Sequence, residues 1–135
     1  TAADTFAEGV ATRTPYELTF ATLLEGLEDF VTVTDAELAE TIRLLLRTTH
    51  NLVEGAGAVG VAGALKMRDR LEGKRVGVVF SGANLDSTVL KRILNHEIWS
   101  AAAPDTKLNL VPGKVRRWRI EIFEFGFLDF ALVQS

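Results

Sequence analysis

The chain of 135 residues has no cysteine, so disulfide bonds and thiolate metal sites are excluded. No apolar run reaches the roughly 18 residues of a membrane-spanning helix. Residues 1–10 also lack the basic start and following apolar run of a signal peptide. Acidic residues outnumber basic ones, and the net charge of -3 does not favour nucleic acid or an anionic membrane as a partner. From these absences we predict a cytoplasmic protein without a nucleic-acid or membrane partner.

The sequence also has no methionine at its start. A chain that begins inside a longer protein would look like this, and so would a processed one. Apolar residues make up 47% of the chain, which is enough for a hydrophobic core and far from a disordered composition.

Capping signals and apolar periodicity predict helices in three places. Residues 14–17 and 34–37 have the composition of capping boxes, each followed by apolar residues at helical spacing. Asp86 or Ser87 predicts the start of another helix, which runs to about Asn95. In the first helix we expect one side to face a core, and that side holds Leu18, Leu23, Leu24 and Leu27.

Two segments have the composition of strands. Residues 30–33 are short and β-branched, and residues 75–80 form a nearly continuous apolar run, typical of a strand that is buried on both faces. The order of elements between residues 27 and 95 predicts an α/β fold, as part of a three-layer, mostly parallel sheet flanked by helices. Residues 114–130 are rich in aromatic side chains and predict a β-rich tail.

A short polar turn follows the second predicted strand, at the end where ligands gather in open α/β sheets. Ser81 offers a neutral hydroxyl, Gly82 lets the backbone approach a flat ligand, and Asn84 can donate and accept hydrogen bonds. From this spacing alone, a purely structural turn is favoured over a binding site.

Residues 53–58 and 78–84 together resemble the paired signature of the threonine/serine dehydratase family. The similarity is nearly continuous from Thr5 to about Asn95, with the motifs in the family's order and spacing. The chain departs from the family pattern at Ala83, where a second glycine is usual, and at Glu8, where aspartate is frequent. The further matching segments are residues 7–11, 15–20 and 29–37.

This resemblance implies the second, tryptophan-synthase-β-like fold of pyridoxal-phosphate enzymes, with pyridoxal phosphate as cofactor. It places Ser81 at the pyridine nitrogen, Glu54 near the ring and Gly9 along the pocket. Gly82 and Asn84 complete the predicted cofactor-binding set. A serine hydroxyl cannot hold a proton on that nitrogen as a carboxylate would. The ring is then a weaker electron sink, which suits β-elimination more than transamination.

The resemblance also implies that part of the enzyme lies outside this sequence. The family's Schiff-base lysine and glycine-rich phosphate loop lie upstream of the matched region, and none of the five lysines here sits in the family's lysine motif. We therefore expect residues 1–98 to be the carboxyl-terminal part of a catalytic domain, inert alone, and residues 99–135 to be an extension of unknown role. No catalytic or metal-binding residue is predicted in the chain.

The parent enzyme would convert threonine or serine to a 2-oxo acid and ammonia, and we expect it to be a homo-oligomer. Racemases and other lyases share the fold and stay open as alternatives. A non-catalytic α/β binding or structural module is the alternative of a different class. Sequence upstream of Thr1 with a lysine motif and a glycine-rich loop would favour the enzyme.

Three other patterns favour ordinary structural roles. Residues 55–60 fit G-x-G-x-x-G, but a dinucleotide site needs a strand before the glycines, so close helix packing is favoured. The basic residues 114–119 are better explained as a solvated edge strand than as a nucleic-acid contact. His96 and Glu97 are too few ligands for a metal site.

Overall fold

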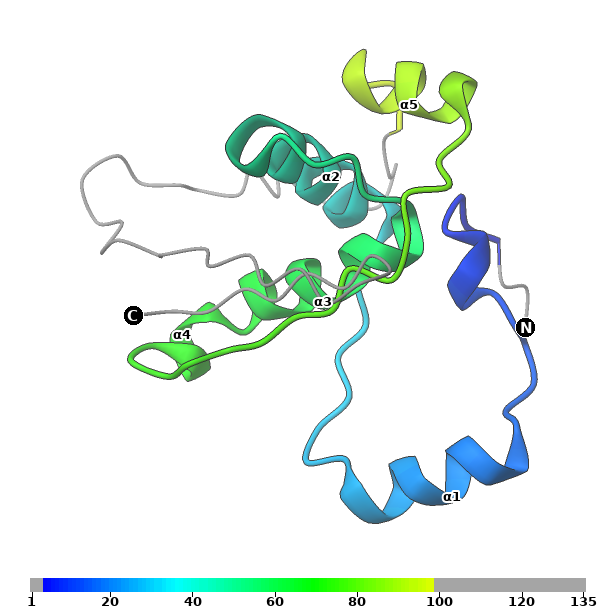
Figure 1. Cartoon of the computed structure of the whole chain (residues 1–135), viewed down its shortest axis with the longest axis vertical. Coiled ribbons are helices and arrows are strands. Elements are labelled where there is room, and N and C mark those ends of the chain that lie inside the picture. The colour runs from blue at the N-terminus through cyan, green and yellow to red at the C-terminus, as the bar shows by residue number, and fades with distance from the viewer. Residues whose placement is uncertain (1–3, 99–135) are drawn as a thin grey trace.

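The computed structural model describes residues 4–98, and in this range every regular element is a helix (Figure 1). None of the described helices is long and apolar enough to cross a membrane. The elements are the 3₁₀ helix η1 Glu8–Val10 and the α-helices α1 Glu17–Gly26, α2 Asp35–Thr49, α3 Gly55–Lys66, α4 Arg68–Leu71 and α5 Ser87–Leu94.

Helix α2 begins at the predicted capping box. The backbone N–H of Glu37 donates to the Thr34 hydroxyl oxygen at 3.2 Å, and the Thr34 N–H donates to the Glu37 carboxylate at 2.7 Å. The prediction for residues 34–37 is confirmed, and a cap of this kind stabilises a helix by about 1 kcal/mol. The box predicted at residues 14–17 is wrong, because α1 begins after Tyr16 and no side chain caps it.

Lys66, at the end of α3, binds this cap from a distant part of the sequence. Its Nζ lies 3.1 Å from Oε1 of Glu37 and donates to the carbonyl of Thr32 at 3.0 Å. Burial alone would raise the pKa of Glu37, but the Thr34 N–H and the Lys66 ammonium outweigh it, so the net pKa is lowered. Because the pKa of Glu37 is lower in the folded chain, these interactions stabilise the fold at pH values above the ordinary glutamate pKa. This stabilisation is lost as the pH falls through the lowered pKa of the folded chain.

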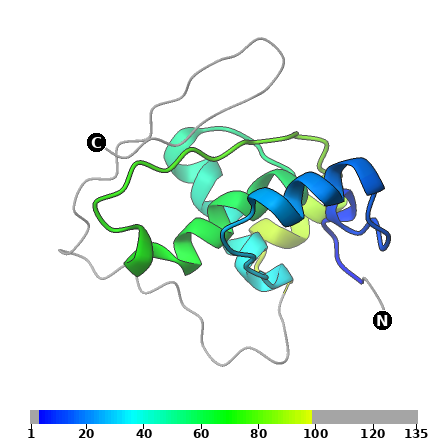
Figure 2. The ribbon, with the colours of Figure 1, turned by 90° about the horizontal axis from the view of Figure 1, so that it is seen from below.

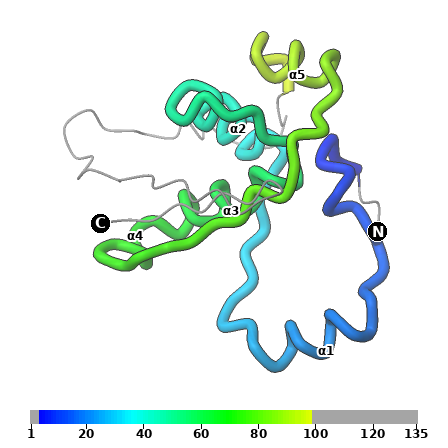
Figure 3. Tube along the Cα trace, viewed as in Figure 1, coloured from blue at the N-terminus to red at the C-terminus, as the bar shows by residue number. Residues whose placement is uncertain are grey.

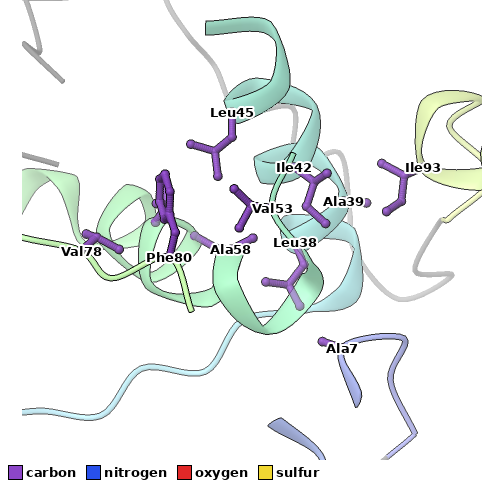
Figure 4. Packing of buried hydrophobic residues seen from close by; sticks show 12 residues of the cluster. Ala7, Leu38, Ala39, Ile42, Leu45, Val53, Ala58, Val78, Phe80 and Ile93 are labelled. Carbon is purple, nitrogen blue, oxygen red and sulfur yellow. The ribbon is translucent and has the colours of Figure 1, made fainter. Parts of the chain in front are cut away.

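The hydrophobic core lies between α2 and α3 and is extended by α5 and by the chain around Phe80 (Figure 4). Helix α2 contributes four of the twelve buried apolar residues, more than any other element, because its apolar residues recur at the three- and four-residue spacing of one helix face. The buried apolar residues of the whole core are Ala7, Leu38, Ala39, Ile42, Leu45, Val53, Ala58, Val61, Ala62, Val78, Phe80 and Ile93.

The predicted parallel sheet is wrong for the part of the chain that the structure describes. Neither residues 30–33 nor residues 75–80 form a strand, and no strand is present between residues 4 and 98. A strand exists through hydrogen bonds to a neighbouring strand, and apolar composition cannot supply that neighbour. The predicted β-rich segment at residues 114–130 lies outside the described residues.

The segment before the Ser81 turn is buried on one side only. Figure 3 shows the chain between α4 and α5 running past α3. Val78 and Phe80 are 7% and 3% exposed, whereas Val79 between them is 63% exposed. Alternate side chains of an extended segment point to opposite sides. The helices therefore cover one side, and residues 4–98 leave the other side, with Val79, uncovered.

Helix α1 stands apart from the core. Figure 1 shows it well below the other helices, and Figure 2, seen from below, shows it in front of them. It contacts none of the other described helices, and each of its residues is exposed. The prediction that its apolar side faces a core is therefore wrong for the described residues. The exposed apolar residues of this region include Leu18, Leu23, Leu24 and Leu27.

Two contacts anchor the ends of the chain segment that contains α1, which runs from Thr5 to Asp29. Before it, the Thr5 hydroxyl donates to the Asp35 carboxylate at 2.5 Å. After it, Arg70 forms an ion pair with Asp29, and the hydrogen bond from Arg70 lowers the pKa of the Asp29 carboxyl. Both ends of this segment are thus bound to other helices, α2 through Asp35 and α4 through Arg70, although α1 itself contacts no other described helix.

Candidate functional site

The polar turn at residues 81–84 is attached to the start of α3. The backbone N–H of Glu54 donates to the carbonyl oxygen of Gly82 at 3.0 Å. This bond joins segments that lie 28 positions apart in the sequence, and both of its residues belong to the predicted cofactor-binding set. The structure therefore brings Glu54 and Gly82 together.

The contact between the turn and α3 is close because glycines form it. A Cβ atom on Gly82 would lie 2.2 Å from Oε1 of Glu54. A Cβ atom on Gly57, in the first turn of α3, would lie 3.0 Å from the carbonyl oxygen of Gly82 and 2.7 Å from Cγ1 of Val53. Real Cβ atoms are essentially never found closer than 3.0 Å to a heavy atom of a residue that is not their chain neighbour. Glycine is therefore the residue that fits both positions as they stand.

Gly9 reaches the same helix from η1. A Cβ atom on Gly9 would lie 2.8 Å from Cβ of Ala56, and one on Gly55 would lie 2.7 Å from Cβ of Ala7. Gly9 and the 81–84 turn both lie against the first residues of α3. Three of the five predicted residues thus gather around one helix start.

The remaining two predicted residues present polar side chains to solvent. Ser81 and Asn84 are exposed, and neither side chain hydrogen-bonds to another described residue. The turn also has an internal hydrogen bond, in which the N–H of Leu85 donates to the carbonyl oxygen of Ala83 at 2.8 Å. An exposed hydroxyl and an exposed amide on a braced backbone are available to a ligand from outside the described residues.

Asp86 begins α5 immediately after the turn. Its carboxylate accepts from the backbone N–H of Thr88 at 2.7 Å and of Val89 at 3.3 Å. The hydrogen bond from Thr88 is the largest cause of the lowered pKa of Asp86. Of the two predicted caps, Asp86 rather than Ser87 does the capping, so this carboxylate belongs to the helix.

The residues that back the turn were not part of the predicted site. Gly57 lies between the Gly82 backbone and the Val53 side chain, with no room for a Cβ atom. The only sequence signal was the glycine pattern at residues 55–60, which occupies the first half of α3. The close packing favoured for those glycines is present, since a Cβ on Gly60 would lie 2.6 Å from Cγ1 of Val78.

The other charged clusters have structural partners. Nδ1 of His96 lies 3.9 Å from Oε1 of Glu40, which also pairs with Arg43 at 2.5 Å. Among residues 4–98, no three histidine, aspartate or glutamate side chains come together as a group that could hold a metal ion. The basic residues 114–119 lie outside the described range.

Comparison with known proteins identifies the family of this chain. The family model described as "Pyridoxal-phosphate dependent enzyme" matches residues 1–82. The chain belongs to this enzyme family. The cofactor of this family is pyridoxal phosphate, and the predicted resemblance to threonine/serine dehydratases is confirmed by relatives named L-threonine ammonia-lyase and L-threonine dehydratase.

Three relatives illustrate the range of named activities in this pyridoxal-phosphate family. The chain is 41% identical over 91 residues to an L-threonine ammonia-lyase of Thermotoga maritima, covering 67% of this chain and 22% of the relative. It is 35% identical over 124 residues to an L-threonine ammonia-lyase of Geobacter sulfurreducens, covering 89% and 31%. It is 33% identical over 82 residues to a serine racemase of Schizosaccharomyces pombe, covering 61% and 25%. The chain thus spans less than a third of the length of each of these relatives.

Proposed function

We propose that this chain supplies part of the cofactor site of a pyridoxal-phosphate-dependent dehydratase that converts threonine or serine to a 2-oxo acid and ammonia. The observation that carries the proposal is the Ser81 turn. In a chain of this family, an exposed hydroxyl stands on a backbone braced against the start of α3 by the Glu54–Gly82 hydrogen bond.

The residues present fit the cofactor. The missing side chains of Gly82 and Gly9 let the turn and η1 lie close against Glu54 and Ala56 at the start of α3. We assign Ser81 to the pyridine nitrogen, because a hydroxyl can donate to or accept from that atom while staying neutral. Asn84 would hydrogen-bond from the same turn, and Glu54 and Gly9 would lie around the ring. When bound, pyridoxal phosphate supplies the electron sink for eliminating a β-substituent from an amino acid.

The remaining parts of the site belong, in this proposal, to the rest of the family domain. The lysine that bonds to the cofactor and the loop that holds its phosphate are assigned there. Support comes from the lengths of the relatives, of which this chain spans 22% to 31% in the two threonine ammonia-lyases. We also propose, as for the parent enzyme, a homo-oligomer in the cytoplasm. The absence of cysteine is compatible with a reducing compartment.

The chain by itself is expected to be catalytically inert. A lysine in the correct position is needed to bond to the cofactor and to move the α-proton, and none of the five lysines matches the family motif. The test adds pyridoxal phosphate and L-threonine to the purified 135-residue chain and measures ultraviolet–visible absorbance and 2-oxobutanoate. A stoichiometric cofactor absorbance band together with 2-oxobutanoate production would refute this expectation.

In a complete enzyme that contains these residues, Ser81→Ala is expected to weaken cofactor binding and turnover while the fold is kept. The lost hydrogen bond is typically worth about 0.5–1.5 kcal/mol net, or roughly a two- to tenfold change in affinity. The cofactor spectrum, its dissociation constant and the rate of 2-oxo acid formation are the measurements. Ala83→Gly, which restores the usual family residue beside it, is the matched control and should change little.

Unchanged spectra and turnover in Ser81→Ala would contradict the assignment. The same assay distinguishes the second named activity among the relatives, because a racemase would form D-serine from L-serine. The 33% identity to a serine racemase makes that control necessary. D-serine without 2-oxo acid would replace the dehydratase by a racemase while leaving the Ser81 contact in place.

A further inference from the structure

The Glu54 side chain occupies the space that a side chain at position 82 would need. A Cβ atom on Gly82 would lie 2.2 Å from Oε1, 3.0 Å from Cδ and 3.7 Å from Oε2 of Glu54. The backbone N–H of the same residue donates to the Gly82 carbonyl oxygen at 3.0 Å. Glu54 therefore contacts the Ser81 turn twice, once through its backbone and once through its carboxyl group.

The carboxyl group of Glu54 does not cap α3, the helix that follows it. Glu54 is the N-cap of α3, where exposed N–H groups and the helix dipole attract a carboxylate. Its side chain nevertheless makes no capping hydrogen bond to α3. It is directed over Gly82 instead, and it is half-buried there. A role in helix capping, the usual explanation for an acidic residue at this place, is thus excluded by the geometry.

We propose that Glu54 is a positioning residue, whose carboxyl group fills the side-chain space of Gly82 and so fixes the backbone that presents the Ser81 hydroxyl. The importance of this for the cofactor rests on the function proposed above. The positioning itself is a property of this chain alone. It explains why glycine stands at position 82, whereas Ala83, which is exposed and has no positive φ, tolerates a methyl group.

Two different substitutions should then have the same consequence. Glu54→Ala removes the group that covers the turn. Gly82→Ala puts a methyl group where that carboxyl group lies, and the flexible end of the glutamate moves away at little cost to the fold. In both variants the turn loses the same support, so combining them should add nothing. Glu54→Gln keeps the shape of the side chain and should keep the turn.

Amide hydrogen exchange in the full 135-residue chain, without cofactor, tests this. The reporters are the amides of Leu85 and Glu54, which bond to the carbonyl oxygens of Ala83 and Gly82. After correction for intrinsic rates, Glu54→Ala and Gly82→Ala should each speed their exchange by about tenfold, because local opening becomes easier. The double variant should match the single ones, and Glu54→Gln should match the wild type.

Two controls separate positioning from general loosening. The Leu38 amide, which bonds to Thr34 in α2, should exchange at the wild-type rate in all variants. Gly77→Ala, where a Cβ meets nothing within 4 Å, should leave the Leu85 amide unchanged. Unchanged exchange in Glu54→Ala, effects that multiply in the double variant, or a Gln variant that behaves like Ala would each overturn the proposal. Because no cofactor is present, such a result would leave the Ser81 assignment standing.

Discussion

Replacing Ile42 with alanine is expected to destabilise the chain by about 2–5 kcal/mol. Ile42 is 1% exposed at the centre of α2, and Figure 4 shows it in the middle of the buried cluster, with Leu38 and Val53 nearby. Removal of its larger side chain loses buried apolar contacts and leaves a cavity, and close-packed surroundings relax only in part. Since small domains are stable by only about 5–15 kcal/mol, this loss is a large fraction of the total.

Urea unfolding followed by circular dichroism measures this effect. The midpoint should fall while the slope stays the same, because the surface exposed on unfolding changes little. Leu18→Ala is the matched control, since Leu18 lies on α1 and is 84% exposed. Its effect should stay within about 0.5 kcal/mol, as for ordinary surface substitutions. A loss at Leu18 as large as at Ile42 would mean that the apolar side of α1 is buried in solution.

Replacing Gly57 with alanine is expected to destabilise the chain by about 1–3 kcal/mol, although alanine favours helices. The added Cβ would lie 2.7 Å from Cγ1 of Val53, which is 2% exposed, and 3.0 Å from the backbone oxygen of Gly82. Neither neighbour is the loose end of a flexible side chain. The strain must therefore be relieved by moving α3 away from the turn, and the Glu54 amide should exchange faster as a second sign of it.

Gly63 provides the opposite result in the same helix. A Cβ there meets nothing within 4 Å. Gly63→Ala should therefore stabilise by about 0.5–1 kcal/mol, the ordinary gain from alanine in a helix interior. Thermal and urea unfolding of the two variants, side by side, measure the contrast. Equal effects at Gly57 and Gly63 would show that the turn does not pack on α3 as described.

The sequence predicted the helices well where the signal is local. The box at residues 34–37 caps α2 because its two hydrogen bonds connect residues three positions apart, with no help from elsewhere. Asp86 caps α5 for the same reason. The similar pattern at residues 14–17 failed, and α1, which contacts no other described helix, begins without a side-chain cap.

The cofactor-binding residues stay a prediction, and the way they pack together was not predicted. Family resemblance pointed to Ser81, Gly82, Asn84, Glu54 and Gly9, and the structure joins Glu54 to Gly82 directly. The close approach of Gly57 to the Gly82 backbone could not be predicted, because it depends on how α3 packs on a turn more than 20 residues away. The direction of the Glu54 side chain, over Gly82 and not toward its own helix, also depends on how α3 packs on this turn.

By itself, the sequence determined the family, the capping box of α2 and the place where α5 begins. These features depend on side-chain chemistry within a few positions or on matched motifs. Tertiary structure alone decided that Glu54 covers Gly82, that α1 keeps its apolar side exposed, and that residues 75–80 are covered on one side only. A strand needs a neighbouring strand, and a buried face needs a surface to pack on. The local sequence indicates that a segment is suited to such pairing or burial, but it does not specify where the partner lies.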